Sequence, residues 1–228
     1  MVGIGVTGAA MLACLLFYLR FLIPAVAALV LIYLFAHLPH EVFRKLLHMV
    51  AFFSAPLIMH AAPNWLVAVA TLVLFGAVVW PILVLGERLP WYADIFVQRR
   101  THEVRRSLLI LFWGDAAIVA WCWGLCGRPQ VAVAAILMWG FGDAAAALVG
   151  KRFGKHHVSL PLADHKKTWE GSAAMCAVEL VVGLLVLGAC PQVLLAALAG
   201  AYVELITHGG YDTITVPVAN ALVLLLLG

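Results

Sequence analysis

The sequence predicts an all-α fold, a polytopic membrane helical bundle with eight or nine transmembrane spans. Of its 228 residues, 65% are hydrophobic and only 11% are charged, whereas about a quarter of the residues of a soluble globular protein are charged. Long apolar segments recur along the chain, and they do not alternate with polar residues as the strands of a membrane barrel do. We therefore expect one integral membrane domain over residues 1–228, built from helices packed against helices.

Each long apolar segment is expected to form one span. Several segments are shorter than the roughly 20 residues of a perpendicular span, so their boundaries are approximate. Only Arg20 and Pro24 separate the first two segments, which form two extra N-terminal spans, a broken helix or a re-entrant pair within residues 1–40. The segments lie near residues 3–19, 22–37, 46–62, 64–85, 107–126, 129–149, 171–190, 191–207 and 213–227.

Basic residues are concentrated in alternate loops, which predicts the orientation of the protein in the membrane. Twelve of the 14 lysines and arginines lie in the second, fourth and sixth of the expected loops, and only Arg20 and Arg128 lie elsewhere. Loops rich in lysine and arginine stay in the cytoplasm. With nine spans the N-terminus is cytoplasmic too. We expect a multi-pass protein of a bacterial inner membrane or of an organellar membrane such as the endoplasmic reticulum, with its functional segments facing the cytoplasm.

The stretch 139–172 carries the strongest functional signal. Asp143 lies in an apolar segment, where a charge at the bilayer centre costs at least about 2.5 kcal/mol. Glycines free the backbone around the basic residues that follow, a composition suited to wrapping a polyanion, and a lone carboxylate beside phosphates suits Mg²⁺. The alternative is a structural aspartate paired with a lysine. The glycines are Gly150 and Gly154, and the basic residues are Lys151, Arg152, Lys155, Lys166 and Lys167.

A second polar segment precedes the third expected span. On a helix, Glu41 meets Arg44 and Lys45 three and four residues later, and His48 lies one turn beyond Arg44. These residues are suited to form a cationic wall for phosphates with an acid–base pair beside it. The alternative is an ordinary cytoplasmic anchor. Residues 86–106 mix charges with aromatic residues and are predicted to form an amphipathic segment that lies on anionic headgroups.

A third polar segment follows the eighth expected span. Glu204 and His208 are four residues apart at the end of a helix, and a Gly-Gly turn brings Asp212 back to the interface. These carboxylates are suited to complete a metal site with Asp143, and the alternative is a simple polar loop.

Two further acids lie in apolar segments without evident partners. Asp115 is a second-tier functional candidate, and Glu179 is expected to be structural.

Four motifs occur in a fixed order along the chain. They are E-x-x-R-K-x-x-H (41–48), G-D-A-A-A-A-L-V-G-K-R-F-G (142–154), K-K-T-W-E-G-S (166–172) and E-x₇-D-T-I-T-V-P (204–217). Together they resemble the CTP-dependent lipid-alcohol kinases, which include dolichol kinase, phytol and farnesol kinase and the yeast-type diacylglycerol kinase. The resemblance covers about residues 41–217. The lysine–threonine–tryptophan element is also shared with CDP-diacylglycerol synthase, which makes that enzyme the natural alternative.

The resemblance implies roles for individual residues. Asp143 would bind the metal, Asp212 would be a second metal or catalytic carboxylate, and Glu204 is a further metal candidate. Candidates for catalysis are Asp143, Asp212, His48 and Lys167. Thr213 departs from the family, which usually has asparagine there. The residues implied to hold or shape the nucleotide site are Arg44, Lys45, Gly150, Lys151, Arg152, Gly154, Lys155, Lys166, Lys167, Thr168, Glu170 and Gly171.

The resulting expectation is a membrane kinase with Mg²⁺ as cofactor. It would transfer the γ-phosphate of CTP, or of another nucleotide, to the hydroxyl of phytol, farnesol, dolichol or diacylglycerol. The enzymatic alternative is a phosphatidate cytidylyltransferase, in which a lipid phosphate attacks the α-phosphorus, and the non-enzymatic alternative is a lipid transporter or scaffold. The expected partners are a membrane lipid and a nucleotide but no nucleic acid, and the oligomeric state is left open.

Overall fold

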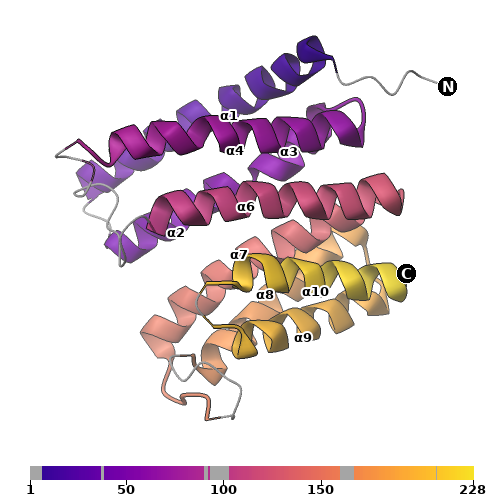
Figure 1. Cartoon of the computed structure of the whole chain (residues 1–228). Coiled ribbons are helices and arrows are strands. Elements are labelled where there is room, and N and C mark those ends of the chain that lie inside the picture. The colour runs from indigo at the N-terminus through magenta and orange to yellow at the C-terminus, as the bar shows by residue number, and fades with distance from the viewer. Residues whose placement is uncertain (1–6, 37–38, 90–91, 93–102, 160–166, 209) are drawn as a thin grey trace. The chain divides into compact units, whose positions relative to one another are not determined.

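The computed structural model describes residues 7–36, 39–89, 92, 103–159, 167–208 and 210–228. Within these ranges the regular structure is helical, apart from one isolated bridge between His157 and Thr168, which confirms the all-α prediction (Figure 1). The chain forms two compact units, Met1–Ala120 and Trp121–Gly228, and each is described by itself.

Unit 1 contains five described helices around an aromatic core. In this unit α1 packs on α2, α3 and α4, while α6 packs on α2, α3 and α4. The rings of Tyr18, Phe75 and Phe112 form the centre of the core, and all three are buried. The helices are α1 (Gly8–Ala36), α2 (His40–Phe52), α3 (Ser54–Ala61), α4 (Trp65–Gly86) and α6 (Glu103–Val119).

Helix α1 is continuous, so the expected separation into two segments near Arg20 is wrong. Its 29 residues include Pro24. Proline removes one backbone hydrogen bond and often kinks a helix, but the residues on both sides are apolar, and in lipid an uninterrupted helix satisfies the remaining backbone groups. The helix is about 44 Å long at 1.5 Å per residue. With one first span instead of two, the charge rule places the N-terminus opposite the basic loops.

Unit 2 is a four-helix bundle that follows a π-helical turn, η1 (Ala120–Leu125). Helix α7 packs against α8 and α10, and α9 packs against α8 and α10 (Figure 1). Proline begins both α7 and α9, at a position where its missing N–H has no partner to lose. The helices are α7 (Pro129–Phe153), α8 (Trp169–Leu187), α9 (Pro191–Ile206) and α10 (Asp212–Leu226).

A polar pair lies at the centre of this bundle. Nδ2 of Asn220 in α10 donates to Oε1 of Glu179 in α8 over 3.1 Å, and both residues are fully buried. Room for the pair comes from glycines on the other two helices, because a Cβ at Gly142 or Gly200 would collide with the glutamate side chain. Glu179 therefore has the structural role expected of it, with a partner that the sequence did not reveal.

In the part of the chain that the structure describes, six helical segments are long and apolar enough to cross a membrane. Two shorter apolar helices, α9 and α10, have 16 and 15 residues. The described residues thus form a helical membrane protein with six candidate spans. Because α1 replaces the first two expected spans, the total of nine does not hold, and the total of eight stays a prediction. The six segments are Gly8–Phe35, Val42–Ala61, Trp65–Gly86, Val104–Leu125, Pro129–Phe153 and Trp169–Leu187.

Candidate functional site

The predicted phosphate-binding stretch lies where α7 ends and α8 begins, and glycines bring these two helices into close contact. A Cβ at Gly171 would lie 2.9 Å from the carbonyl oxygen of Ala146, and one at Gly150 would lie 3.1 Å from Oγ1 of Thr168. Thr168 is the N-cap of α8, where its hydroxyl accepts a hydrogen bond from the amide of Gly171 over 3.2 Å. The two glycines and the threonine therefore fix the junction between the helices.

The chain just after α7 is bound to the chain just before α8. The amide of Val158 donates to the carbonyl of Lys167, and the amide of Trp169 donates to the carbonyl of His156, each over 3.0 Å. Val158 is buried against Leu205 of α9. These contacts hold residues 154–159 against the end of the bundle where α7 ends and α8 begins, although the segment contains no helix.

Glu170 reinforces the same segment. Its carboxylate accepts from the amide of His156 at 3.3 Å and lies 2.6 Å from the Nδ1 atom of that histidine. An acidic side chain in the first turn of a helix is also stabilised by the helix dipole. Glu170 thus binds His156 of the loop, and the role in the nucleotide site that the resemblance implies stays a prediction. His156 was not predicted, because nothing in the spacing of the two residues distinguishes it from its neighbour His157.

Lys167 is bound by the end of α9. Its Nζ atom lies 2.8 Å from Oε1 of Glu204 and donates to the backbone carbonyls of Glu204 and, over 3.1 Å, of Thr207. An ammonium group has three N–H donors, so protein acceptors use all of them in this structure. A cation at the C-terminal end of a helix is favourable for the helix dipole. The prediction that Lys167 contacts phosphate stays untested.

Two further carboxylates act electrostatically on the glutamate that binds this lysine. The charges of Asp212 and Asp143 both act on Glu204, which is 7% exposed. Asp212 is the first residue of α10 and accepts from the amide of Thr213 over 3.0 Å. Helix α7 continues ten residues beyond Asp143, to Phe153, so this aspartate lies about 15 Å from the helix end.

The donor set of this site suits a metal that is shared with a phosphate ligand. Among the described residues, no group of three or more acidic, histidine or cysteine side chains is arranged to hold a metal ion, and Glu204 is engaged by Lys167. Mg²⁺ commonly takes one or two carboxylates together with water and substrate phosphates. Asp143 and Asp212 are carboxylates of that kind, and the metal roles of Asp143, Asp212 and Glu204 all stay predictions.

The cations of the same stretch face outward. Lys151, Arg152 and Lys155 are all exposed, and the guanidinium of Arg152 lies 5.7 Å from the ring centre of Phe153. Lys166 lies outside the described residues. The basic surface at the end of α7 therefore borders the loop that the helix junction holds in place.

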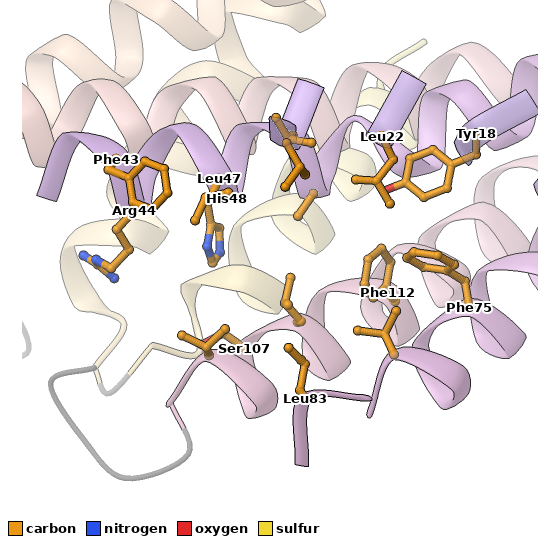
Figure 2. Close-up of a pocket in the computed structure, with 16 residues that line it drawn as sticks. Tyr18, Leu22, Phe43, Arg44, Leu47, His48, Phe75, Leu83, Ser107 and Phe112 are labelled. Carbon is orange, nitrogen blue, oxygen red and sulfur yellow. The ribbon is translucent and has the colours of Figure 1, made fainter. Parts of the chain in front are cut away.

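The predicted residues near the chain's start belong to unit 1. Arg44, Lys45 and His48 lie on α2, and the side chain of Glu41 lies outside the described part of the chain. Arg44 and His48 line an apolar cavity of unit 1 (Figure 2). Because the other site residues belong to unit 2, a pocket shared by both sets stays a prediction.

Two further polar features of unit 1 were singled out in the sequence. Asp115 is buried in α6, at 2% exposed. In the predicted amphipathic segment 86–106, Arg105, which belongs to α6, lies 3.4 Å from Glu87 and 4.6 Å from the ring centre of Trp80. Residues 90–91 and 93–102 of that segment lie outside the described residues, so its expected position on the headgroups stays a prediction.

The fold and site define a class, a helical membrane protein with a cluster of acids and bases at one end of a four-helix bundle. No known protein-family model matches the chain, and no solved structure matches it. A phytol kinase from Synechocystis sp. is 30% identical over 198 residues, which cover 81% of this chain and 78% of that protein. The chain belongs to the lipid-alcohol kinase family that includes phytol kinase.

Proposed function

We propose that the protein transfers the γ-phosphate of CTP, or of another nucleoside triphosphate, to the hydroxyl of a lipid alcohol in the membrane. The observation that carries this proposal is the likeness to phytol kinase over four fifths of the chain. The acids and exposed cations at one end of unit 2 support it, because phosphoryl transfer asks mainly for positioning and charge neutralisation.

Unit 2 would bind the nucleotide. The exposed cations Lys151, Arg152 and Lys155 would contact the phosphates, and Asp143 and Asp212 would hold Mg²⁺ with them. When bound, the metal would neutralise charge on the triphosphate. Lys167 and Glu204 would act as positioning residues, since their ion pair joins the start of α8 to the end of α9.

The attacking hydroxyl has to lose its proton during the reaction. With both aspartates on the metal, His48 would accept this proton; if only one aspartate holds the metal, the other is the alternative acceptor. A carboxylate or an imidazole is basic enough to act near neutral pH when it lies within hydrogen-bond reach of the hydroxyl. We further propose that this chemistry takes place at the cytoplasmic face, where the positive-inside rule places the basic loops.

Nucleotide labelled at a single phosphorus tests the reaction. Purified protein would be incubated with CTP carrying the label at the γ or at the α position, and with phytol, farnesol, dolichol or diacylglycerol. The γ-label is expected in the lipid fraction and the α-label in released CDP. ATP, GTP and UTP assayed in parallel identify the preferred donor.

Two outcomes would contradict the proposal. Transfer of the α-label to a lipid phosphate, with release of pyrophosphate, would identify a cytidylyltransferase. Failure to consume any nucleotide with any lipid would favour a transporter or scaffold. The variant Asp143→Asn, prepared in the same way, controls for a contaminating kinase because its activity should be lost while its unfolding temperature is kept.

A further inference from the structure

Unit 1 contains an elongated, partly open apolar cavity between α1, α2, α4 and α6. Its volume is about 220 Å³, and most of its lining is hydrocarbon. The polar side chains in the lining are Tyr18, Arg44, His48 and Ser107. Figure 2 shows Arg44 and His48 toward one end and Tyr18 at the other. The cavity thus has a polar end with a cation and an imidazole, and an end formed by aromatic rings.

The spacing of the lining residues gives the cavity its length. Three of the helices each contribute residues at positions i, i+4 and i+8, which lie on one face of a helix. Eight residues of helix rise by about 12 Å, so the cavity follows the helix axes for about two turns. The three sets are Tyr18, Leu22 and Val26 on α1; Phe75, Val79 and Leu83 on α4; and Val104, Leu108 and Phe112 on α6.

The aromatic end of the cavity is a packed wall. The ring of Tyr18 meets the ring of Phe75 edge to face, with centroids 5.0 Å apart, and Phe75 meets Phe112 in the same way at 4.9 Å. Edge-to-face pairs at these separations attract one another beyond simple area burial, and all three rings are buried. These packed rings therefore limit how far a chain that enters from the polar end can extend into the cavity.

We propose that this cavity binds the hydrocarbon chain of a single-chain lipid alcohol, with the hydroxyl toward Arg44 and His48 and the chain directed at the wall. This inference rests on the proposed function and deepens it, because it assigns the lipid to unit 1 and the nucleotide to unit 2. Ligand pockets for drug-sized molecules measure about 300–1,000 Å³, so about 220 Å³ admits part of one chain rather than two.

Shape complementarity, rather than the hydrophobic effect, would determine which lipid chain binds in the cavity. Lipid tails are as apolar as the cavity lining, so moving a chain from the bilayer into the protein gains little from the hydrophobic effect. The free energy of binding comes instead from the fit of the chain to the cavity and from the contacts of the hydroxyl at the polar end. Holding the hydroxyl there raises its effective concentration for reaction. The site should therefore be sensitive to the length and the branching of the chain.

Neighbouring residues on α4 provide a matched pair of variants. Val79 lines the cavity, whereas the adjacent Val78 is 49% exposed on the outer surface. Val79→Trp should fill the cavity, raise the KM for the twenty-carbon alcohol phytol at least tenfold and leave the KM for CTP unchanged. Val78→Trp introduces the same side chain outside the cavity and should change neither constant by more than twofold. The ten-carbon alcohol geraniol should be affected less than phytol.

A second pair on α1 guards against misfolding of one variant. Leu22 lines the cavity, and the adjacent Ile23 is 64% exposed. Leu22→Trp is expected to behave as Val79→Trp does, and Ile23→Trp as the wild type. If both cavity variants turn over phytol like their surface partners, the cavity is not the lipid site, even though γ-phosphate transfer by the wild type would still support the kinase.

Photolabelling separates lipid binding from catalysis. A phytol analogue with a diazirine about 12 Å along the chain from the hydroxyl, which is the length of the cavity, should label peptides that contain Tyr18, Phe75 or Phe112, and Val79→Trp should abolish this labelling. Excess phytol should compete, and diacylglycerol should not. Labelling confined to outward-facing residues would overturn the inference, and equal competition by diacylglycerol would overturn its single-chain part. Labelling of the wall without any γ-phosphate transfer would keep the site but contradict the proposed kinase activity.

Discussion

The Nζ atom of Lys167 lies 2.8 Å from Oε1 of Glu204, and the two residues are separated by most of α8 and α9 in the chain. The lysine also donates to the last carbonyls of α9. The ammonium group of Lys167 thus joins the chain just before α8 to the end of α9. This attachment lies beside the loop 154–159, which would face the nucleotide phosphates in the proposed function.

Lys167→Met should lower stability as well as activity. It leaves the buried Glu204 without its cation, and breaking one side of a buried ion pair is destabilising. Glu204→Gln should cost less, and a double-mutant cycle should give a coupling of about 0.5–3 kcal/mol. Free energies of unfolding of the single and double variants in detergent measure it. Lys155→Met is the control. Because Lys155 is exposed, this variant should raise the KM for CTP but change the free energy of unfolding by less than about 0.5 kcal/mol. Additive effects at 167 and 204 would show that the pair is not coupled.

Gly171→Ala should destabilise unit 2. Its methyl group would lie 2.9 Å from the carbonyl oxygen of Ala146, and overpacking of this kind costs about 1–3 kcal/mol. A lower unfolding temperature and weaker CTP binding are the expected readouts. Gly8→Ala in α1 is the matched control, because nothing lies within 4 Å of its added methyl group. Equal unfolding temperatures for the two variants would contradict the close helix contact.

Thr168→Val should destabilise the start of α8 by about 1 kcal/mol, the usual cost of losing an N-cap side chain. Valine has the shape of threonine but cannot accept the bond from the Gly171 amide. Thr168→Ser keeps the hydroxyl and should retain most of the stability. Hydrogen exchange at the Gly171 amide checks the cause, since exchange should be faster in the valine variant alone.

Asp143→Asn and Asp212→Asn should each reduce kcat by about 100-fold or more, the scale of losing one group that stabilises charge in a transition state. Both should also require more Mg²⁺ for half-maximal rate. Asp115→Asn is the control, because this aspartate is buried in unit 1 and should leave the Mg²⁺ dependence unchanged. If either unit 2 variant keeps the wild-type rate and Mg²⁺ requirement, that residue does not hold the metal.

Hydrophobicity predicted most helix positions from the sequence. Pro129 and Pro191 begin helices where the apolar segments were expected to begin. The end of α7 was predicted too early, because an apolar criterion stops at Gly150 whereas Lys151 and Arg152 continue the helix. Basic residues are favourable in the last helical turn.

The contacts that join distant residues were beyond a reading of the sequence. Lys167 was assigned to phosphate because it is basic, but its partner lies on α9, and only tertiary packing brings them together. The cavity of unit 1 could not be predicted either, because it too forms only through tertiary packing. Its lining is spread over four helices, and each residue by itself, such as Val79 or Leu108, is an ordinary apolar side chain.

Residues 154–159 are shaped by the protein's own bonds, through the amides of Val158 and Trp169 and the pair of Glu170 with His156. A loop of this kind does not depend on a ligand for its shape. Nucleotide binding should therefore carry a small ordering penalty, because a preorganised surface loses little conformational entropy on association. Calorimetry should show CTP binding with only a modest unfavourable entropy, and the backbone amides of the loop should exchange hydrogen at similar rates before and after CTP is added.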